Sequence, residues 1–147
     1  MAITYQLQIN APIEKVFDLV DDDDKIKLWM EGLEETIYTS PQDRENPVGT
    51  TFKQKIREGG RVTEYDGVVT AYEKPKHLGV QISNSSFAMQ VDYRFTSTPT
   101  GTRLDYVAEM VDPSWFTRLM SKLFSWLTNR ILHKHMKNLK ALGERQA

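Results

Sequence analysis

The chain begins with a strict alternation of apolar and polar positions. Ile3, Tyr5, Leu7 and Ile9 are separated by polar residues, and this period of two is typical of a strand with one buried face. The sequence therefore predicts a first strand that packs against a core on one side only.

Helical spacing replaces this alternation after Pro12, a residue that suits the first turn of a helix. Apolar residues of the segment 13–20 recur at the spacing of one helix face. The four aspartates at 21–24 end this helix and can cap a second one, which runs through Trp29 and stops at Gly32. Two short helices are therefore expected after the first strand.

The middle of the chain returns to strand patterns that are separated by turn residues. Gly59-Gly60 and Thr98-Pro99-Thr100-Gly101 fit tight hairpins. Short connections between successive strands favour an antiparallel meander. The expected strands are Glu35–Thr39, Thr51–Glu58, Arg61–Tyr72, Leu78–Ser83, Phe87–Thr98 and Thr102–Val111.

One long helix is expected in the last third of the chain. Asp112-Pro113 is a strong start signal for a helix, and no stop signal follows before Gly143. The apolar side chains cover more of the helix circumference than one core-facing stripe requires, so part of this surface can meet a ligand, a partner or a membrane. These side chains are Trp115, Phe116, Leu119, Met120, Leu123, Phe124, Trp126, Leu127, Ile131, Leu132, Met136, Leu139 and Leu142.

The predicted elements form an α+β fold, in which a curved antiparallel sheet and two short helices wrap around the long C-terminal helix. The inward face of Arg61–Tyr72 is ambiguous, because Gly67 can mark a bulge that shifts the register, and either Glu64 or Tyr65 points inward. We expect a cavity between the sheet and the long helix. Its expected lining is Trp29, Gln54, Ile56, Tyr65, Val80, Met89, Val91, Tyr93, Tyr106, Ala108, Trp115, Leu119 and Leu123.

Composition narrows the possible partners. Charged residues make up 27% of the chain and hydrophobic residues 39%, as in ordinary globular proteins, and 147 residues fit one domain, 1–147. The net charge of -1 argues against a nucleic-acid partner. The N-terminus lacks a signal-peptide pattern, and no apolar run reaches the roughly 20 residues of a membrane span, so we expect a cytoplasmic protein.

Conventional catalytic and metal-binding patterns are scarce. The chain has no cysteine, which excludes thiolate nucleophiles and cysteine-ligated zinc. His133 and His135 point to different faces of a helix because they are two positions apart, so we expect neither a metal site nor a cofactor. Glu64 is the single carboxylate that we consider as a general base, and only if it is buried with a raised pKa.

Four short motifs follow one another along nearly the whole chain. They are Ile9-Asn10-Ala11-Pro12-Ile13-Glu14-Lys15-Val16-Phe17, Asp21 followed by Trp29, Gly67-Val68-Val69 with Pro75-Lys76-His77-Leu78, and Leu139-Lys140-Ala141-Leu142. In this order they resemble the SRPBCC superfamily, the START-like or helix-grip proteins that include polyketide cyclases and lipid-transfer domains. The resemblance implies a helix-grip fold and a pocket for a hydrophobic ligand, but no catalytic motif that can be placed on this sequence.

Three functions follow from these observations. The first is binding of a small hydrophobic molecule, lipid-like or aromatic, without transforming it. The second is a cyclase or dehydratase of polyketide type that polarises its substrate with Tyr93, Tyr106 and Glu64. The third is an interaction module, a homodimer or a transient membrane contact, that uses the outer face of the long helix. The residues of that face are Trp115, Phe116, Trp126 and Leu127, interleaved with Arg118, Lys122 and Arg130.

Overall fold

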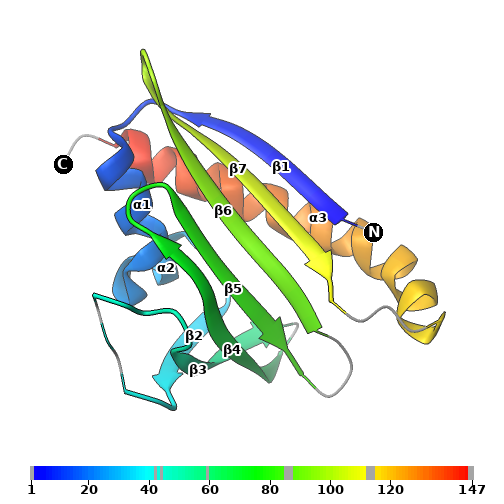
Figure 1. Ribbon diagram of the computed structural model, residues 1–147. Coiled ribbons are helices and arrows are strands. Elements are labelled where there is room, and N and C mark those ends of the chain that lie inside the picture. Colours follow the sequence, from blue (N-terminus) through cyan, green and yellow to red (C-terminus); the bar gives the residue numbers. More distant parts are fainter. Residues whose placement is uncertain are drawn as a thin grey trace.

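The computed structural model describes residues 2–41, 43, 45–58, 60–84, 88–111 and 115–145, and the side chains of all of these except residues 2, 58 and 115–129. Among the described residues, seven strands and three helices follow one another (Figure 1). They are β1 (Ala2–Ile9), α1 (Ile13–Asp21), α2 (Asp23–Trp29), β2 (Leu33–Tyr38), β3 (Thr51–Glu58), β4 (Arg61–Glu73), β5 (His77–Ser83), β6 (Ala88–Thr98), β7 (Gly101–Met110) and α3 (Trp115–Glu144).

The strands form one antiparallel sheet in the order β1-β7-β6-β5-β4-β3-β2. Strands β2 to β7 pair with their neighbours in sequence, so they form the predicted meander, and β1 joins its far edge beside β7. Figure 1 shows the sheet curving, with α1 and α2 at one end and α3 running along the side of β1. This arrangement confirms the predicted α+β helix-grip fold.

The two short helices are positioned by local chemistry. Pro12 stands at the N-cap position of α1. The Asp22 side chain caps α2 by accepting hydrogen bonds from the backbone N–H groups of Asp24 and Lys25, as expected for an aspartate before a helix. The buried side of α1, which includes Phe17, packs into the core.

The long helix α3 contacts β1, α1 and α2. Its buried positions Leu132, Met136 and Leu139 recur at the spacing of one helix face, whereas Ile131 is exposed. No helix in the part of the chain that the structure describes is long and apolar enough to cross a membrane. The core against which α3 packs includes Ile9, Val16, Phe17, Trp29 and Leu104.

The register of β4 decides which of its residues face the helices. Tyr65 pairs with Gln54, and Gly67 pairs with Phe52 and Ile82, so Tyr65 lies on the same face as these residues. Glu64 therefore lies on the opposite, convex face. The pairing with β3 is continuous through Gly67, where the sequence left a bulge open, and the register with β5 shifts between Val69 and Ala71 instead.

Candidate functional site

Inward-facing residues of neighbouring strands line up in rows across the concave face of the sheet. One row joins Tyr5 on β1, Tyr106 on β7, Tyr93 on β6, Leu78 on β5 and Tyr72 on β4 through direct cross-strand pairs. We call it the tyrosine row. Directly opposed residues lie about 5 Å apart at Cβ, so these four phenol rings and one leucine form a continuous band.

Both ends of the tyrosine row are attached to helices. The Tyr5 hydroxyl shares a hydrogen bond with His133 Nδ1 of α3 over 2.8 Å, and Tyr72 donates a hydrogen bond of 2.8 Å to Asp21 at the end of α1. Burial raises the pKa of Asp21 above its ordinary 3.8, although the Tyr72 hydrogen bond and the Lys74 charge act in the opposite direction. The outer tyrosines thus tie the sheet to α1 and α3.

The two central tyrosines have a different environment. The side chains of Tyr93 and Tyr106 are buried, and their rings meet edge to face. Among the residues that the structure describes, none forms a hydrogen bond with either hydroxyl. Burial raises the pKa of Tyr93 well above its usual range and the pKa of Tyr106 to about 12, so both phenols stay protonated near neutral pH and can donate.

Two apolar rows lie beside the tyrosine row. The first joins Ile3, Ala108, Val91, Val80 and Val69, and the second joins Met110, Met89, Ile82, Gly67 and Phe52.

Burial differs from one position of these rows to the next. Val91 and Ala108 are buried, but Val80, Ile82 and Met89 are partly exposed. The described core therefore leaves part of an apolar floor uncovered on β5 and β6.

A row of polar residues lies beyond the two apolar rows. Thr36 on β2, Gln54 on β3 and Tyr65 on β4 are paired directly across the strands, and we call them the polar row. Thr36 Oγ1 is buried and has no hydrogen-bond partner among the described residues. The Gln54 amide has no hydrogen-bond partner among the described residues either, but Gln54 is partly exposed, so Thr36 Oγ1 is the one of these two groups that is buried without a described partner.

Charged side chains of the sheet lie on its other face. Lys53 pairs with Glu64 at 3.0 Å, and the Glu64 side chain is 47% exposed. We required a general base to be buried, and Glu64 is not. The register of β4 places it on the convex face, so it is no longer a candidate for that role. Among the described residues, no Asp, Glu, Lys, Arg or His occupies an inward position in the tyrosine, apolar or polar rows.

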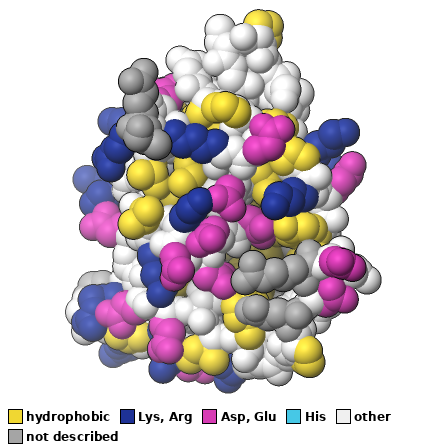
Figure 2. Space-filling model, turned by 90° about the vertical axis from the view of Figure 1, so that its left-hand side faces the viewer, with side chains coloured by type: hydrophobic (Ala, Val, Ile, Leu, Met, Phe, Trp, Pro, Cys, Tyr) yellow, Lys and Arg dark blue, Asp and Glu magenta, His cyan; other side chains and the backbone are white. Residues whose placement is uncertain are grey.

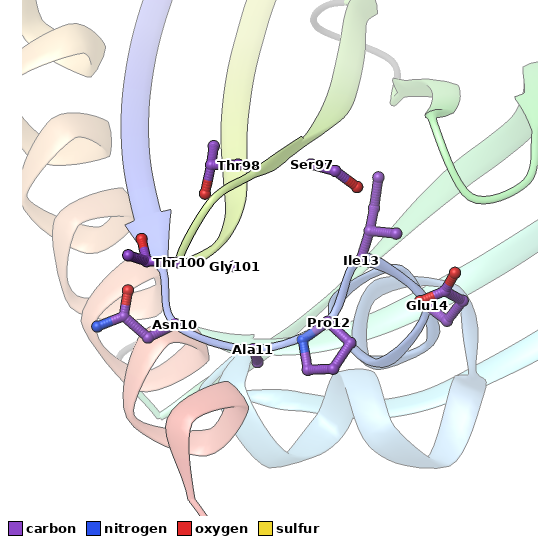
Figure 3. A pocket seen from close by; sticks show the side chains of 9 residues that line it. All are labelled: Asn10, Ala11, Pro12, Ile13, Glu14, Ser97, Thr98, Thr100 and Gly101. Atoms are coloured by element: carbon purple, nitrogen blue, oxygen red, sulfur yellow. The ribbon is translucent and has the colours of Figure 1, made fainter.

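Surface grooves occur elsewhere in the described part of the chain. One groove of about 420 Å³ lies between the β1–α1 turn and the β6–β7 hairpin, as Figure 3 shows. Ser97, Thr98 and Thr100 give it a polar side, and it adjoins the end of β6 opposite to Met89. Figure 2 shows cationic and anionic side chains interspersed on one face of the molecule, without a large patch of one sign.

Similarity to known proteins identifies the family of the chain. The family model described as polyketide cyclase / dehydrase and lipid transport matches residues 1–144. The chain belongs to this family. The match and the helix-grip fold also confirm the SRPBCC superfamily, which the sequence motifs predicted.

Solved structures of proteins with low sequence identity share the fold. The di-domain ARO/CYC protein StfQ from the steffimycin biosynthetic pathway aligns with a TM-score of 0.77 at 12% identity, over 97% of this chain and 50% of its own. Protein CV1439 from Chromobacterium violaceum aligns with a TM-score of 0.75 at 16% identity, over 99% of both chains. TTHA0849 from Thermus thermophilus aligns with a TM-score of 0.73 at 16% identity, over 96% of this chain and 95% of its own. Among curated proteins, none matches the chain.

The residues that the sequence predicted to line the cavity are distributed unevenly in the structure. The strand residues of that prediction all lie on the concave face, and they are Gln54, Ile56, Tyr65, Val80, Met89, Val91, Tyr93, Tyr106 and Ala108. Trp115, Leu119 and Leu123 lie outside the residues whose side chains are described, as do Trp126 and the other aromatics of the helix's outer face. Ligand contact by any of these residues remains a prediction.

Trp29, which the sequence predicted to line the cavity, is buried in contacts with other parts of the protein. Its side chain is buried with 1% exposure, and Nε1 donates a hydrogen bond of 2.7 Å to the Leu19 carbonyl. His135 lies beside it with ring centroids 6.5 Å apart, and burial lowers the pKa of this histidine. Trp29 thus packs α2 against α3, and its role as a ligand contact remains a prediction.

The candidate site also has features that the sequence did not reveal. The sequence assigned Thr36 to a strand but to no face, and the register now places it opposite Gln54. The pairs Tyr5–His133 and Tyr72–Asp21 join residues far apart in the chain. No group of three potential metal ligands occurs among the described residues.

Proposed function

We propose that this protein binds a small hydrophobic molecule, lipid-like or aromatic, on the concave face of the sheet beside α3. The observation that carries the proposal is the pair of hydroxyls on the buried side chains of Tyr93 and Tyr106, which have no hydrogen-bond partner among the described residues. A ligand that covers these hydroxyls must supply a hydrogen-bond partner, because a polar group that is removed from water without one costs about 1–3 kcal/mol. A ligand oxygen beside the two phenols would meet this requirement.

The apolar rows support the same proposal. Val80, Ile82, Met89 and Met110 are apolar residues on an inward face, yet each is partly exposed. Covering apolar surface stabilises a complex by roughly 25 cal/mol per Å². The floor thus offers hydrophobic contact at one part of the ligand, while the central tyrosines offer hydrogen bonds at another.

The comparisons are consistent with this function at the level of the family. Its printed description includes lipid transport, and the neighbour StfQ is an ARO/CYC protein. These descriptions belong to other proteins. For this chain, the proposal depends on the concave face itself.

Nile red, an uncharged dye that fluoresces in apolar sites, provides a direct test. We expect saturable binding by the wild-type protein and a loss of about tenfold in affinity for Val80→Gln, which places an amide on the apolar floor. Val68→Gln is the matched control, because Val68 faces the convex side of β4 and pairs with Gln81. Absence of saturable binding, or equal loss in both variants, would contradict the proposal.

Native mass spectrometry of the gently purified protein adds an independent measurement. An added mass that matches a lipid or an aromatic compound is the expected result, and acid release of that compound should return the mass of the free chain. The Val80→Gln protein should retain less of the same compound.

A cyclase or dehydratase of polyketide type is the second candidate. It is favoured by the two protonated phenols, whose raised pKa values keep them as donors that can polarise a substrate carbonyl. With a linear polyketide mimic, Tyr93→Phe and Tyr106→Phe should then lower turnover, while Glu64→Gln should leave it unchanged because Glu64 faces the convex side. Binding of the mimic without any product would favour the first function.

A further inference from the structure

We infer that Thr36 and Gln54 form a second polar subsite, which binds a neutral hydroxyl or carbonyl at the far end of the ligand. The ligand is then elongated and uncharged, with one oxygen beside Tyr93 and Tyr106 and another beside the polar row. This inference rests on the proposed function and specifies the class of molecule that the same face accepts.

The hydroxyl of Thr36 is the first support for the subsite. Thr36 Oγ1 is buried without a partner among the described residues, although its neighbours on β2 are well paired: Glu35 lies near Lys55 at 3.8 Å, and Glu34 accepts from Arg57 at 2.7 Å. Buried hydroxyls in folded proteins nearly always have a partner. An unsatisfied one on the inward face therefore indicates a group that is bound there.

Gln54 supplies the second polar group of the subsite. It is paired directly with Thr36 across β2 and β3, so their side chains project together on the concave face. A primary amide can both donate and accept. The pair can therefore satisfy a hydroxyl or a carbonyl oxygen without any change of charge.

The separation between the two polar positions sets the shape of the ligand. The two apolar rows lie between the tyrosine row and the polar row, as the inward positions Gly67 and Val69 of β4 show. Each step between rows is two residues on β5 and from Gly67 to Tyr65 on β4, about 6.6 Å along a strand, so the rows are on the order of 20 Å apart along the strands. Gln54 on β3 and Thr36 on β2 also lie three or more strands away from Tyr93 on β6, which adds about 15 Å across the sheet before its curvature is considered. A compact ligand cannot reach both rows.

The charge distribution determines which end groups fit. Near the polar row, the charged side chains of Lys53, Lys55 and Glu64 lie on the convex face and pair there. Among the described residues, none of the inward rows contains a charged side chain, and the Asp23 carboxylate on α2 already accepts a hydrogen bond of 2.6 Å from the Tyr38 hydroxyl. Moving an unpaired charge to such a face costs far more than moving a hydroxyl, so the far end of the ligand is neutral.

A series of straight-chain probes tests this inference by displacement of Nile red. For each length from about eight to about twenty carbons, the mono-alcohol, the α,ω-diol and the carboxylate are compared. We expect one range of lengths at which the diol binds about fivefold to tenfold more tightly than the mono-alcohol, because it gains one hydrogen bond. The carboxylate should bind at least about tenfold more weakly than the mono-alcohol of equal length.

Two variants locate the second oxygen. In Thr36→Val, which keeps the shape of the side chain, the advantage of the diol should disappear, while the affinity for the mono-alcohol stays within about twofold. Gln54→Leu should have the same effect. Thr96→Val is the matched control, because Thr96 is exposed on the convex side of β6 and the advantage should persist.

The outcomes separate this inference from the proposed function. Equal affinity of diols and mono-alcohols at every length, or a diol advantage that survives both Thr36→Val and Gln54→Leu, would overturn the second subsite while leaving hydrophobic binding intact. If neither Nile red nor any alcohol binds, the proposed function fails, and the subsite fails with it.

Discussion

The rings of Tyr93 and Tyr106 meet edge to face in the middle of the tyrosine row, with centroids 5.2 Å apart and an interplanar angle of 73°. Edge-to-face contact of this kind stabilises both ring positions. Because the rings hold each other, the two hydroxyls keep fixed positions without hydrogen bonds from the described residues. A fixed donor loses little conformational entropy when a ligand binds.

Removal of these hydroxyls should lower the affinity for a ligand without changing the free energy of unfolding. Tyr93→Phe and Tyr106→Phe each keep the ring contact, so the free energy of unfolding should change by less than about 0.5 kcal/mol. Affinity for Nile red, which carries a carbonyl oxygen, should fall about fivefold to tenfold for the phenol that contacts it. Urea unfolding and fluorescence titration measure the two effects. Lower stability with unchanged affinity would assign these hydroxyls a structural role instead.

Tyr72 should show the opposite pattern, because its hydroxyl already has a protein partner. Tyr72→Phe removes the donor to Asp21 and should lower the free energy of unfolding by about 1–2 kcal/mol. Its effect on Nile red affinity should be small. Urea unfolding provides the measurement, and the Tyr93→Phe protein is its natural comparison.

The raised pKa of Asp21 predicts a pH dependence with a defined sign. The folded protein holds the carboxyl proton more tightly than the unfolded chain, whose value is near 3.8. The resulting stabilisation is present at low pH and is lost as the pH rises from about 3.8 through the folded pKa. Asp21→Asn cannot ionise and still offers an acceptor to Tyr72, so its stability relative to wild type should increase across this window and then level off.

Asp21 is partly exposed, and solvent screening should hold this difference below about 1 kcal/mol. Unfolding curves of both proteins at several pH values give the difference directly. A difference that is independent of pH would show that the Asp21 carboxyl does not titrate differently in the folded state.

Thr36→Val should stabilise the empty protein while it weakens binding of a diol. The substitution replaces a buried hydroxyl without a described partner by a methyl group, which should raise the free energy of unfolding by about 1 kcal/mol. Thr102→Val is an informative contrast, because Thr102 is fully buried and donates to the Ala11 carbonyl at 2.8 Å. That variant should be destabilised, and a destabilised Thr36→Val protein would contradict our account of Thr36.

The close approach of Phe52 to Gly67 gives a prediction about register. A Cβ added at Gly67 would overlap the Phe52 ring, so Gly67→Ala should cost about 1–3 kcal/mol of stability through overpacking. In the double variant with Phe52→Leu, the added cost of the alanine should shrink, since the smaller side chain leaves room. Additive effects in a double-mutant cycle would contradict the contact, and with it the placement of Tyr65 on the concave face.

Much of the fold could be predicted from local patterns. The expected strand Thr51–Glu58 agrees with β3 at both ends, and Arg61–Tyr72 agrees with β4 to within one residue. Period-two alternation and turn residues are local properties of the chain, so they can be recognised without knowing what packs where. The same alternation placed Gln54, Tyr93 and Tyr106 on one face of the sheet, as the register confirms.

The choice between Glu64 and Tyr65 could not be made from the sequence. Both alternatives follow from one strand pattern, and a shift of one residue exchanges every side chain between the faces. Pairing of Gln54 with Tyr65, and of Lys53 with Asp66, selects the register in which the carboxylates reach solvent and the phenol faces inward. The other register would turn Glu64 toward the concave face and away from Lys53, with which it pairs at 3.0 Å.

The amino-acid sequence by itself determined the order of the elements, the apolar side of most strands and the family to which the chain belongs, because these depend on periodicity and on short motifs. Only the tertiary structure decided which polar groups lack partners among the described residues. The bond from Tyr72 to Asp21 and the isolation of Thr36 Oγ1 both depend on strands and helices that are distant in sequence. Hydrogen bonds act over about 3 Å, so the candidate site emerges only when the fold brings its atoms to that range.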